Sequence, residues 1–96
     1  MEKKWYVYIL TNYTNGVFYT GITNNLQRRI WEHKNGFSSS SFTKRYKLYK
    51  LIWFQEFSSS QEAIESEKRA KDFSRKKKMK LITELNPTFR DFATFH

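Results

Sequence analysis

The feature that most constrains the fold is an aromatic and β-branched segment, residues 5–11, followed by Asn15-Gly16 and a second such segment, residues 17–23. Segments of this composition favour strands, and Asn-Gly is typical of a tight type I′ hairpin turn. The sequence therefore predicts an antiparallel hairpin with a two-residue turn, in which the residues flanking Asn15-Gly16 pair with each other.

The hairpin has two faces, because side chains alternate along a strand. The apolar face, which suits a core, holds Trp5, Val7, Ile9, Phe18, Thr20 and Ile22. The other face holds Tyr6, Tyr8, Leu10, Tyr19, Gly21 and Thr23. A glycine inside a strand often marks the close approach of another group, although tyrosines are also common in strands for packing reasons alone.

Three helices and a third strand are expected after the hairpin. Asn24 or Asn25 caps a helix that runs to about Lys34, and residues 36–48 form a polar, basic loop. Residues 49–57 form a strand that is apolar on both faces, which predicts a central strand or one covered on both sides.

The remaining helices are marked by their caps. Ser59-Ser-Gln-Glu62 is a capping box that opens a helix to about Phe73. Ser74 caps a helix over 75–84, which Asn86-Pro87 ends. The fold class predicted is α+β: one domain over 1–96, with a three-stranded antiparallel sheet flanked by helices in the order β-β-α-β-α-α.

The first helix carries two polar residues on its packing stripe. At about 100° per residue, Arg29 and His33 share a stripe with Leu26 and Ile30, whereas Arg28 points elsewhere. An arginine there can lay its stem along the surface with a solvated head, or hold a phosphate with its planar fork.

Glu67 lies among the small residues Ala63 and Ala70 on the packing side of the second helix. A carboxylate in that position requires a partner: an arginine in a salt bridge, a tyrosine hydroxyl or a divalent cation. Mg²⁺ is commonly held by one carboxylate together with waters and a substrate phosphate, so a single Mg²⁺ or Mn²⁺ ion is expected if metal binds.

These residues resemble the GIY-YIG nuclease domain over about residues 5–85. The two halves of its motif correspond to Tyr6-Val7-Tyr8 and Tyr19-Thr20-Gly21, with Tyr6 where glycine usually stands and Thr20 in place of isoleucine. A basic residue common in the DNA-repair branch is replaced by Ile22. The chain most closely resembles the small stand-alone bacterial members.

The resemblance implies a metal-dependent endonuclease that hydrolyses phosphodiester bonds in DNA. It assigns catalytic roles to Tyr8, Tyr19, Arg29 and His33, metal binding to Glu67, and a possible role to Gly21 and Asn86. Tyr8 or Tyr19 would act as general base or orient the water, and the residues alone do not decide between the tyrosines and His33. Asn86 could equally serve only as a helix stop.

The charge of the chain favours a nucleic-acid partner, most simply DNA. Lys and Arg total 18 against 9 for Asp and Glu, a net charge of +9. Such density can follow a phosphate backbone without reading sequence, although it can also form a solvated helix face. The residues expected to bind nucleic acid are Lys44, Arg45, Lys68, Lys71, Arg75, Lys76, Lys77 and Lys78.

Composition excludes several classes. There is no cysteine, so disulfides and thiolate metal sites are excluded. No apolar run reaches the length of a membrane span or resembles a signal peptide, and we expect a cytoplasmic protein with no membrane or small-molecule cofactor. Two other functions compete with the nuclease: a nucleic-acid-binding module of the same fold without catalysis, and an adaptor whose charge serves a protein partner.

Overall fold

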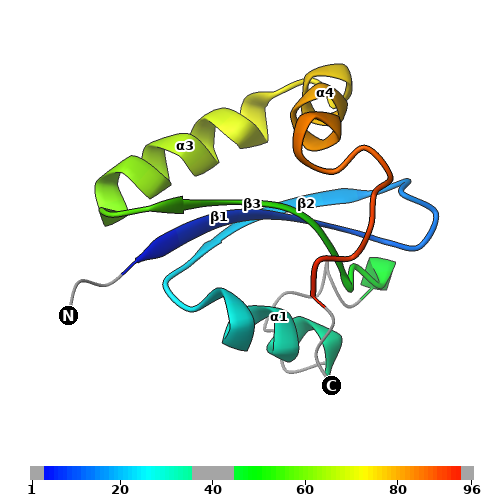
Figure 1. Ribbon diagram of the computed structural model, residues 1–96, viewed down its shortest axis with the longest axis horizontal. Coiled ribbons are helices and arrows are strands. Elements are labelled where there is room, and N and C mark those ends of the chain that lie inside the picture. The colour runs from blue at the N-terminus through cyan, green and yellow to red at the C-terminus, as the bar shows by residue number, and fades with distance from the viewer. Residues whose placement is uncertain (1–3, 36–44, 94–96) are drawn as a thin grey trace.

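The sheet lies between helices on both of its faces in the computed structural model, which describes residues 4–35 and 45–93 (Figure 1). The elements are β1 (Trp5–Thr11), β2 (Phe18–Thr23), α1 (Leu26–Lys34), β3 (Lys50–Phe57), α3 (Ser60–Asp72) and α4 (Arg75–Leu85). The predicted α+β class and element order are confirmed. No helix within the described ranges has the length and apolarity needed to cross a bilayer.

The helix starts follow their caps. The Asn25 side chain accepts from the Arg28 amide at 3.1 Å, and Ser59 and Ser74 accept from the third amide of their own helices, each at 3.2 Å. Each side chain thereby satisfies a backbone donor that has no partner inside the helix. The predicted loop at 36–48 lies mostly outside the described residues, but residues 45–46 are helical rather than irregular.

The central strand is β1, because the sheet order is β2-β1-β3. Of the two alternatives predicted for the third strand, a central position is therefore wrong. Cover on both faces is confirmed for its middle, since Leu51 to Trp53 are buried. The C-terminal segment covers its outer edge there: the Phe92 amide donates to the Leu51 carbonyl at 2.8 Å, and the Leu51 amide donates to Asp91 Oδ1 at 3.0 Å.

The hairpin connection is longer than predicted, and its register is shifted by two residues. Tyr8 lies opposite Gly21 rather than Thr23. Asn12 explains the shift, because its side chain accepts from the Gly16 amide at 2.9 Å and its carbonyl accepts from the Asn15 amide at 3.0 Å. Of the two predicted turn residues, Asn15 takes a left-handed φ of 57° but Gly16 does not, so the type I′ turn does not form. An even shift leaves both predicted faces unchanged.

The sheet separates two hydrophobic layers (Figure 1). The apolar face of the hairpin packs beneath α3 and α4, with a buried core of Val7, Ile9, Ile52, Trp53, Ala63 and Ile82. The tyrosine face packs against α1 and the C-terminal segment, with Tyr8, Leu10, Ile30, Leu48, Leu51 and Ala93 buried. The candidate catalytic residues Tyr8, Tyr19, Arg29 and His33 belong to this second layer, between the sheet and α1.

Candidate functional site

Tyr8 reaches across the edge strand β2 because Gly21 has no side chain. A Cβ on Gly21 would lie 2.4 Å from the Tyr8 hydroxyl oxygen and 2.5 Å from Cζ, closer than any real contact. The tyrosine is only 1% exposed, so its ring has no room to move outward cheaply. Gly21 therefore sets where the Tyr8 hydroxyl lies, as the sequence indicated for a glycine within a strand.

Two side chains of α1 meet that hydroxyl. Arg29 Nε donates to the Tyr8 oxygen at 3.4 Å, and His33 Nε2 lies 3.3 Å from the same oxygen. The two residues are four apart, so they lie on one helical face. The Tyr19 ring completes the group, with its centroid 6.4 Å from that of Tyr8 and 5.9 Å from that of His33. We call these four residues the tyrosine cluster.

Burial keeps the Tyr8 and His33 side chains neutral. Burial raises the pKa of Tyr8 to about 12, although the hydrogen bond from Arg29 opposes this rise. Burial, with the Arg29 charge, lowers the pKa of His33 to about 4. At pH 7 the imidazole is therefore neutral. Its Nδ1 is buried and has no hydrogen-bond partner among the described residues.

Since Arg29 occupies the Tyr8 oxygen as a donor, the phenolic proton is available to His33 Nε2. That arrangement places the imidazole proton on Nδ1. The hydroxyl is thus held between a fixed cation and a neutral base.

The Arg29 side chain is also partly exposed to solvent. Its side chain is 27% exposed and lies 3.7 Å from Glu32. It lines a pocket of about 380 Å³ with Trp5, Asn25 and Glu32 among the neighbours. Glu32 is a member of the site that the sequence prediction missed, and its position three residues after Arg29 was the available signal.

Glu67 does not touch the tyrosine cluster. It belongs to α3, which packs on the opposite face of the sheet against β1 and β2. Its side chain is 15% exposed and pairs with Lys71 at 3.0 Å. Its charge is nonetheless one of the smaller causes that raise the pKa of Tyr8, so it lies within electrostatic reach of the hydroxyl. In the ranges that the structure describes, no group of three or more potential metal ligands occurs.

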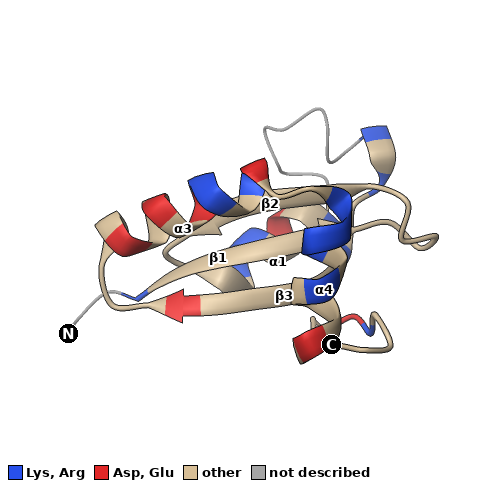
Figure 2. Ribbon diagram, turned by 90° about the horizontal axis from the view of Figure 1, so that it is seen from above, with Lys and Arg blue, Asp and Glu red and all other residues tan. Residues whose placement is uncertain are grey.

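Most of the predicted nucleic-acid-binding residues lie on α4 and the C-terminal half of α3, where Asp72 is also present, and three glutamates precede Lys68 on α3 (Figure 2). Lys68, Lys76 and Lys77 are exposed, and Lys77 Nζ lies 4.2 Å from the centre of the Phe73 ring. The first turn of α4, residues 75–77, is exposed throughout and thus presents a basic surface. Arg45 is exposed and lies over the Tyr46 ring, whereas Lys44 lies outside the described residues.

Arg75 and Asn86 make structural contacts. The Arg75 guanidinium donates to the carbonyls of Asn15 and Gly16, each at 3.0 Å, and stacks 4.7 Å from the Phe18 ring. Asn86 is buried, and its side chain bonds to the backbone of Ile52 and Arg90. Neither residue contacts the tyrosine cluster.

Residues 4–80 match the family described as the GIY-YIG catalytic domain. The chain belongs to the GIY-YIG family. This domain is that of a nuclease family, so an interaction with nucleic acid follows in general terms.

The relatives are small proteins designated UPF0213. The chain is 37% identical over 81 residues to the UPF0213 protein SSP2268 of Staphylococcus saprophyticus, covering 84% of this chain and 96% of the relative. It is 40% identical over 81 residues to a UPF0213 protein of Staphylococcus haemolyticus, with the same coverage. The solution structure of a UPF0213 protein from Bacillus halodurans superposes with a TM-score of 0.59 at 32% identity, over 92% of each chain.

Proposed function

We propose that this protein is an endonuclease that hydrolyses phosphodiester bonds in DNA with the help of one divalent cation. The observation that carries the proposal is the Tyr8 hydroxyl, set in place over Gly21 and contacted by both Arg29 and His33. A hydroxyl held between a cation and a neutral base suits the handling of a water molecule beside a phosphate.

Arg29 has the geometry to hold the phosphate. Its Nε is engaged by Tyr8, its Nη1 lies 3.7 Å from Glu32, and the residue lines the pocket of about 380 Å³. Guanidinium groups hold phosphate oxygens through paired donors and remain charged at all relevant pH values. In this role Arg29 stabilises the negative charge that develops on the phosphate oxygens as water attacks.

His33 offers a proton route that avoids a free phenolate. With a pKa of about 12, releasing the Tyr8 proton at pH 7 costs about 7 kcal/mol. Protonating His33, with a pKa of about 4, costs about 4 kcal/mol at the same pH. We therefore assign Tyr8 to accept a proton from the attacking water while its own proton passes to His33 Nε2. Tyr19 packs beside both groups and restricts their orientation.

Glu67 fits the single cation implied by the family. It is a partly buried carboxylate, and one carboxylate with waters and a phosphate is sufficient for Mg²⁺. When bound, the ion would supply charge to stabilise the leaving oxygen. Glu67 must exchange its contact with Lys71 for the ion, and Lys71 is exposed enough to move aside.

The same ion pair favours a second candidate, a nucleic-acid-binding module of this fold without significant catalysis. If Glu67 serves only to fix Lys71, the basic surface of α3 and α4 would still bind a phosphate backbone. The two candidates differ in whether Glu67 is needed for a chemical step.

Nicking of supercoiled plasmid in Mg²⁺ or Mn²⁺ tests the proposal. We expect nicking by the unmodified protein and its loss in Glu67→Ala and in Arg29→Ala. Glu65→Ala is the matched control for Glu67→Ala, because Glu65 lies on the same helix and is exposed. Circular dichroism would establish that each variant folds. Unchanged nicking in both variants would refute the site, and tight, salt-sensitive DNA binding without nicking in any divalent metal would establish the binding module.

A further inference from the structure

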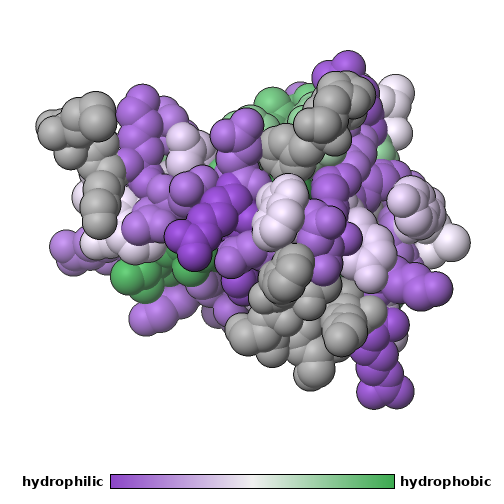
Figure 3. Space-filling view, turned by 90° about the horizontal axis from the view of Figure 1, so that it is seen from below, coloured by the Kyte–Doolittle hydropathy of each residue, from purple (hydrophilic) through white to green (hydrophobic). Residues whose placement is uncertain are grey.

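A second hollow on the α1 face lies between α1 and β3, whereas the tyrosine cluster lies between α1 and β2. Its volume is about 430 Å³, within the range typical of small-molecule sites. The surface on this side of the molecule is mainly hydrophilic with limited hydrophobic patches (Figure 3). We call this hollow the aromatic pocket, after Tyr6, Phe54 and Phe92, which line it.

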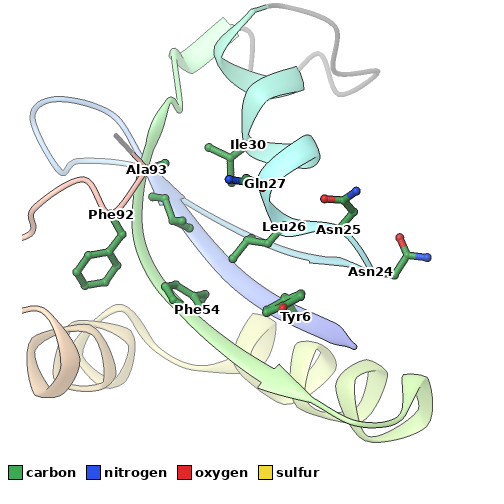
Figure 4. Close-up of a pocket in the computed structure, with 10 residues that line it drawn as sticks. Tyr6, Asn24, Asn25, Leu26, Gln27, Ile30, Phe54, Phe92 and Ala93 are labelled. Carbon is green, nitrogen blue, oxygen red and sulfur yellow. The ribbon is translucent and has the colours of Figure 1, made fainter. Parts of the chain in front are cut away.

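The three rings come from different elements. Tyr6 and Phe54 project from the neighbouring strands β1 and β3 on the sheet side, and Phe92 closes one end from the C-terminal segment (Figure 4). Phe54 and Phe92 pack edge to face with centroids 6.0 Å apart. Phe54 remains 37% exposed, and an aromatic strand residue bordering a hollow offers its ring to a flat apolar ligand.

Amide side chains border the other end. Asn24 and Asn25 lie near Tyr6, and Gln27 lies above the pocket on α1 (Figure 4). Asn24 and Gln27 are exposed and make no side-chain hydrogen bond with any other described residue. Amides present a donor and an acceptor side by side, which matches the edges of nucleobases.

The aromatic pocket adjoins the proposed phosphate site. Asn24 and Asn25 line both the aromatic pocket and the pocket that contains Arg28 and Arg29. A phosphate held by Arg29 and a base in the aromatic pocket would therefore lie on opposite sides of Asn24 and Asn25. The net charge of +9 favours a polyanion over an apolar peptide as the occupant.

We infer that the aromatic pocket binds an unstacked nucleobase of the strand whose phosphate Arg29 holds. The inference rests on the proposed function and extends it to a preference for nucleotides that are not stacked in a duplex. The Tyr6 side chain forms one wall of the pocket. A glycine at that position would remove the wall. Base binding relies on ring contacts and amides, so it carries little sequence preference.

The test is binding of two single-stranded oligonucleotides of equal length and charge, one with bases and one abasic throughout. Fluorescence anisotropy in EDTA separates binding from cleavage. We expect Phe54→Ala to weaken binding of the oligonucleotide with bases by about tenfold to a hundredfold, and to leave binding of the abasic oligonucleotide unchanged. Phe54→Tyr should restore binding, since it keeps the ring.

Tyr13→Ala is the matched control, because Tyr13 is an aromatic residue that is 80% exposed and does not line the pocket. It should change neither affinity. Equal affinity of the two oligonucleotides, or an equal loss on both in a folded Phe54→Ala, would overturn the inference. Base-dependent binding without nicking in any metal would refute the proposed catalysis and leave the pocket assignment standing. Nicking together with equal binding of the two oligonucleotides would support the proposed catalysis and overturn the pocket assignment.

Discussion

The two faces of the sheet use the same strands for different purposes. The face under α3 and α4 is filled by aliphatic side chains such as Val7, Ile9 and Ile82, all fully buried. The face under α1 buries Tyr8 and His33 and leaves a ring nitrogen without a partner among the described residues. Thr20 on the other face also buries a hydroxyl without such a partner. The two faces therefore differ in that, among the described residues, the buried ionisable side chains, Tyr8 and His33, both lie on the α1 face.

The largest effect expected from this comparison is on stability, in the α3 and α4 layer. Ile82→Ala should lower the free energy of unfolding by about 2–5 kcal/mol, because it leaves a cavity in a close-packed core. Urea unfolding measures the loss, and Ile82→Val should cost only about 1 kcal/mol. The nicking rate per folded molecule should not change; a large fall would show that the two faces are not separable.

The next effect belongs to the α1 layer and to activity. Arg29→Ala should reduce the nicking rate by about 10²–10³-fold, the usual cost of removing one donor that stabilises developing charge. Single-turnover kinetics at saturating DNA would measure it. A loss confined to DNA affinity would assign Arg29 to binding alone.

Gly21→Ala should affect activity more than stability. The added methyl would overlap the Tyr8 hydroxyl, so the ring must shift, and a shift of about 1 Å can cost about 100-fold in rate. Overpacking should also cost about 1–3 kcal/mol. Kinetics and urea unfolding on one preparation would measure both. Full activity would show that the ring position is not critical.

His33 should make the protein sensitive to acid. Its pKa of about 4 in the fold lies below the usual value near ~6.5, so the unfolded chain binds more protons between these values. Stability from this residue is complete above about pH 6.5 and is lost as the pH falls towards 4, by about 2 kcal/mol between pH 7 and pH 5. Urea unfolding at both pH values should show a smaller difference in His33→Gln. An equal difference would exclude His33 as the cause.

The smallest effect concerns Thr20 on the apolar face. Its hydroxyl is buried without a hydrogen-bond partner in the described ranges. Thr20→Val removes that group at similar volume and should raise the free energy of unfolding by about 1 kcal/mol, with unchanged nicking. Thermal unfolding would detect the gain, and a loss of stability would mean that the hydroxyl is satisfied in solution.

Local patterns predicted the parts of the fold that depend on neighbours in sequence. The caps at Asn25, Ser59 and Ser74 are confirmed, as are the two faces of the hairpin. The strand order could not be predicted from the sequence. The apolar residues Leu51 to Trp53 are expected to be buried whether a neighbouring strand or the C-terminal segment covers them. That segment has no periodicity to indicate where it packs.

The site was predictable to the extent that it follows from alternation and helical phase. These periodicities selected Tyr8, Gly21 and Arg29, which the structure brings together. They could not show that Asn12 bonds to Gly16 and lengthens the hairpin connection, because side-chain competition for backbone groups is not periodic. The position of Glu67 on α3, which covers the face opposite to α1, also depends on which face each helix covers, and short-range patterns do not encode this.

The C-terminal segment joins layers that the sheet otherwise keeps apart. It leaves α4 on one face, pairs with the edge of β3, and ends beside α1 on the other, where Asp91 contacts Lys34 at 2.6 Å (Figure 1). Helix α1 supplies Arg29 and His33. The Asp91 carboxylate connects this helix to the segment that follows α4, so the position of both side chains depends on that segment. Local opening of that segment would release α1 and β3 together, which makes the last described residues part of the same cooperative unit as the hydroxyl of Tyr8.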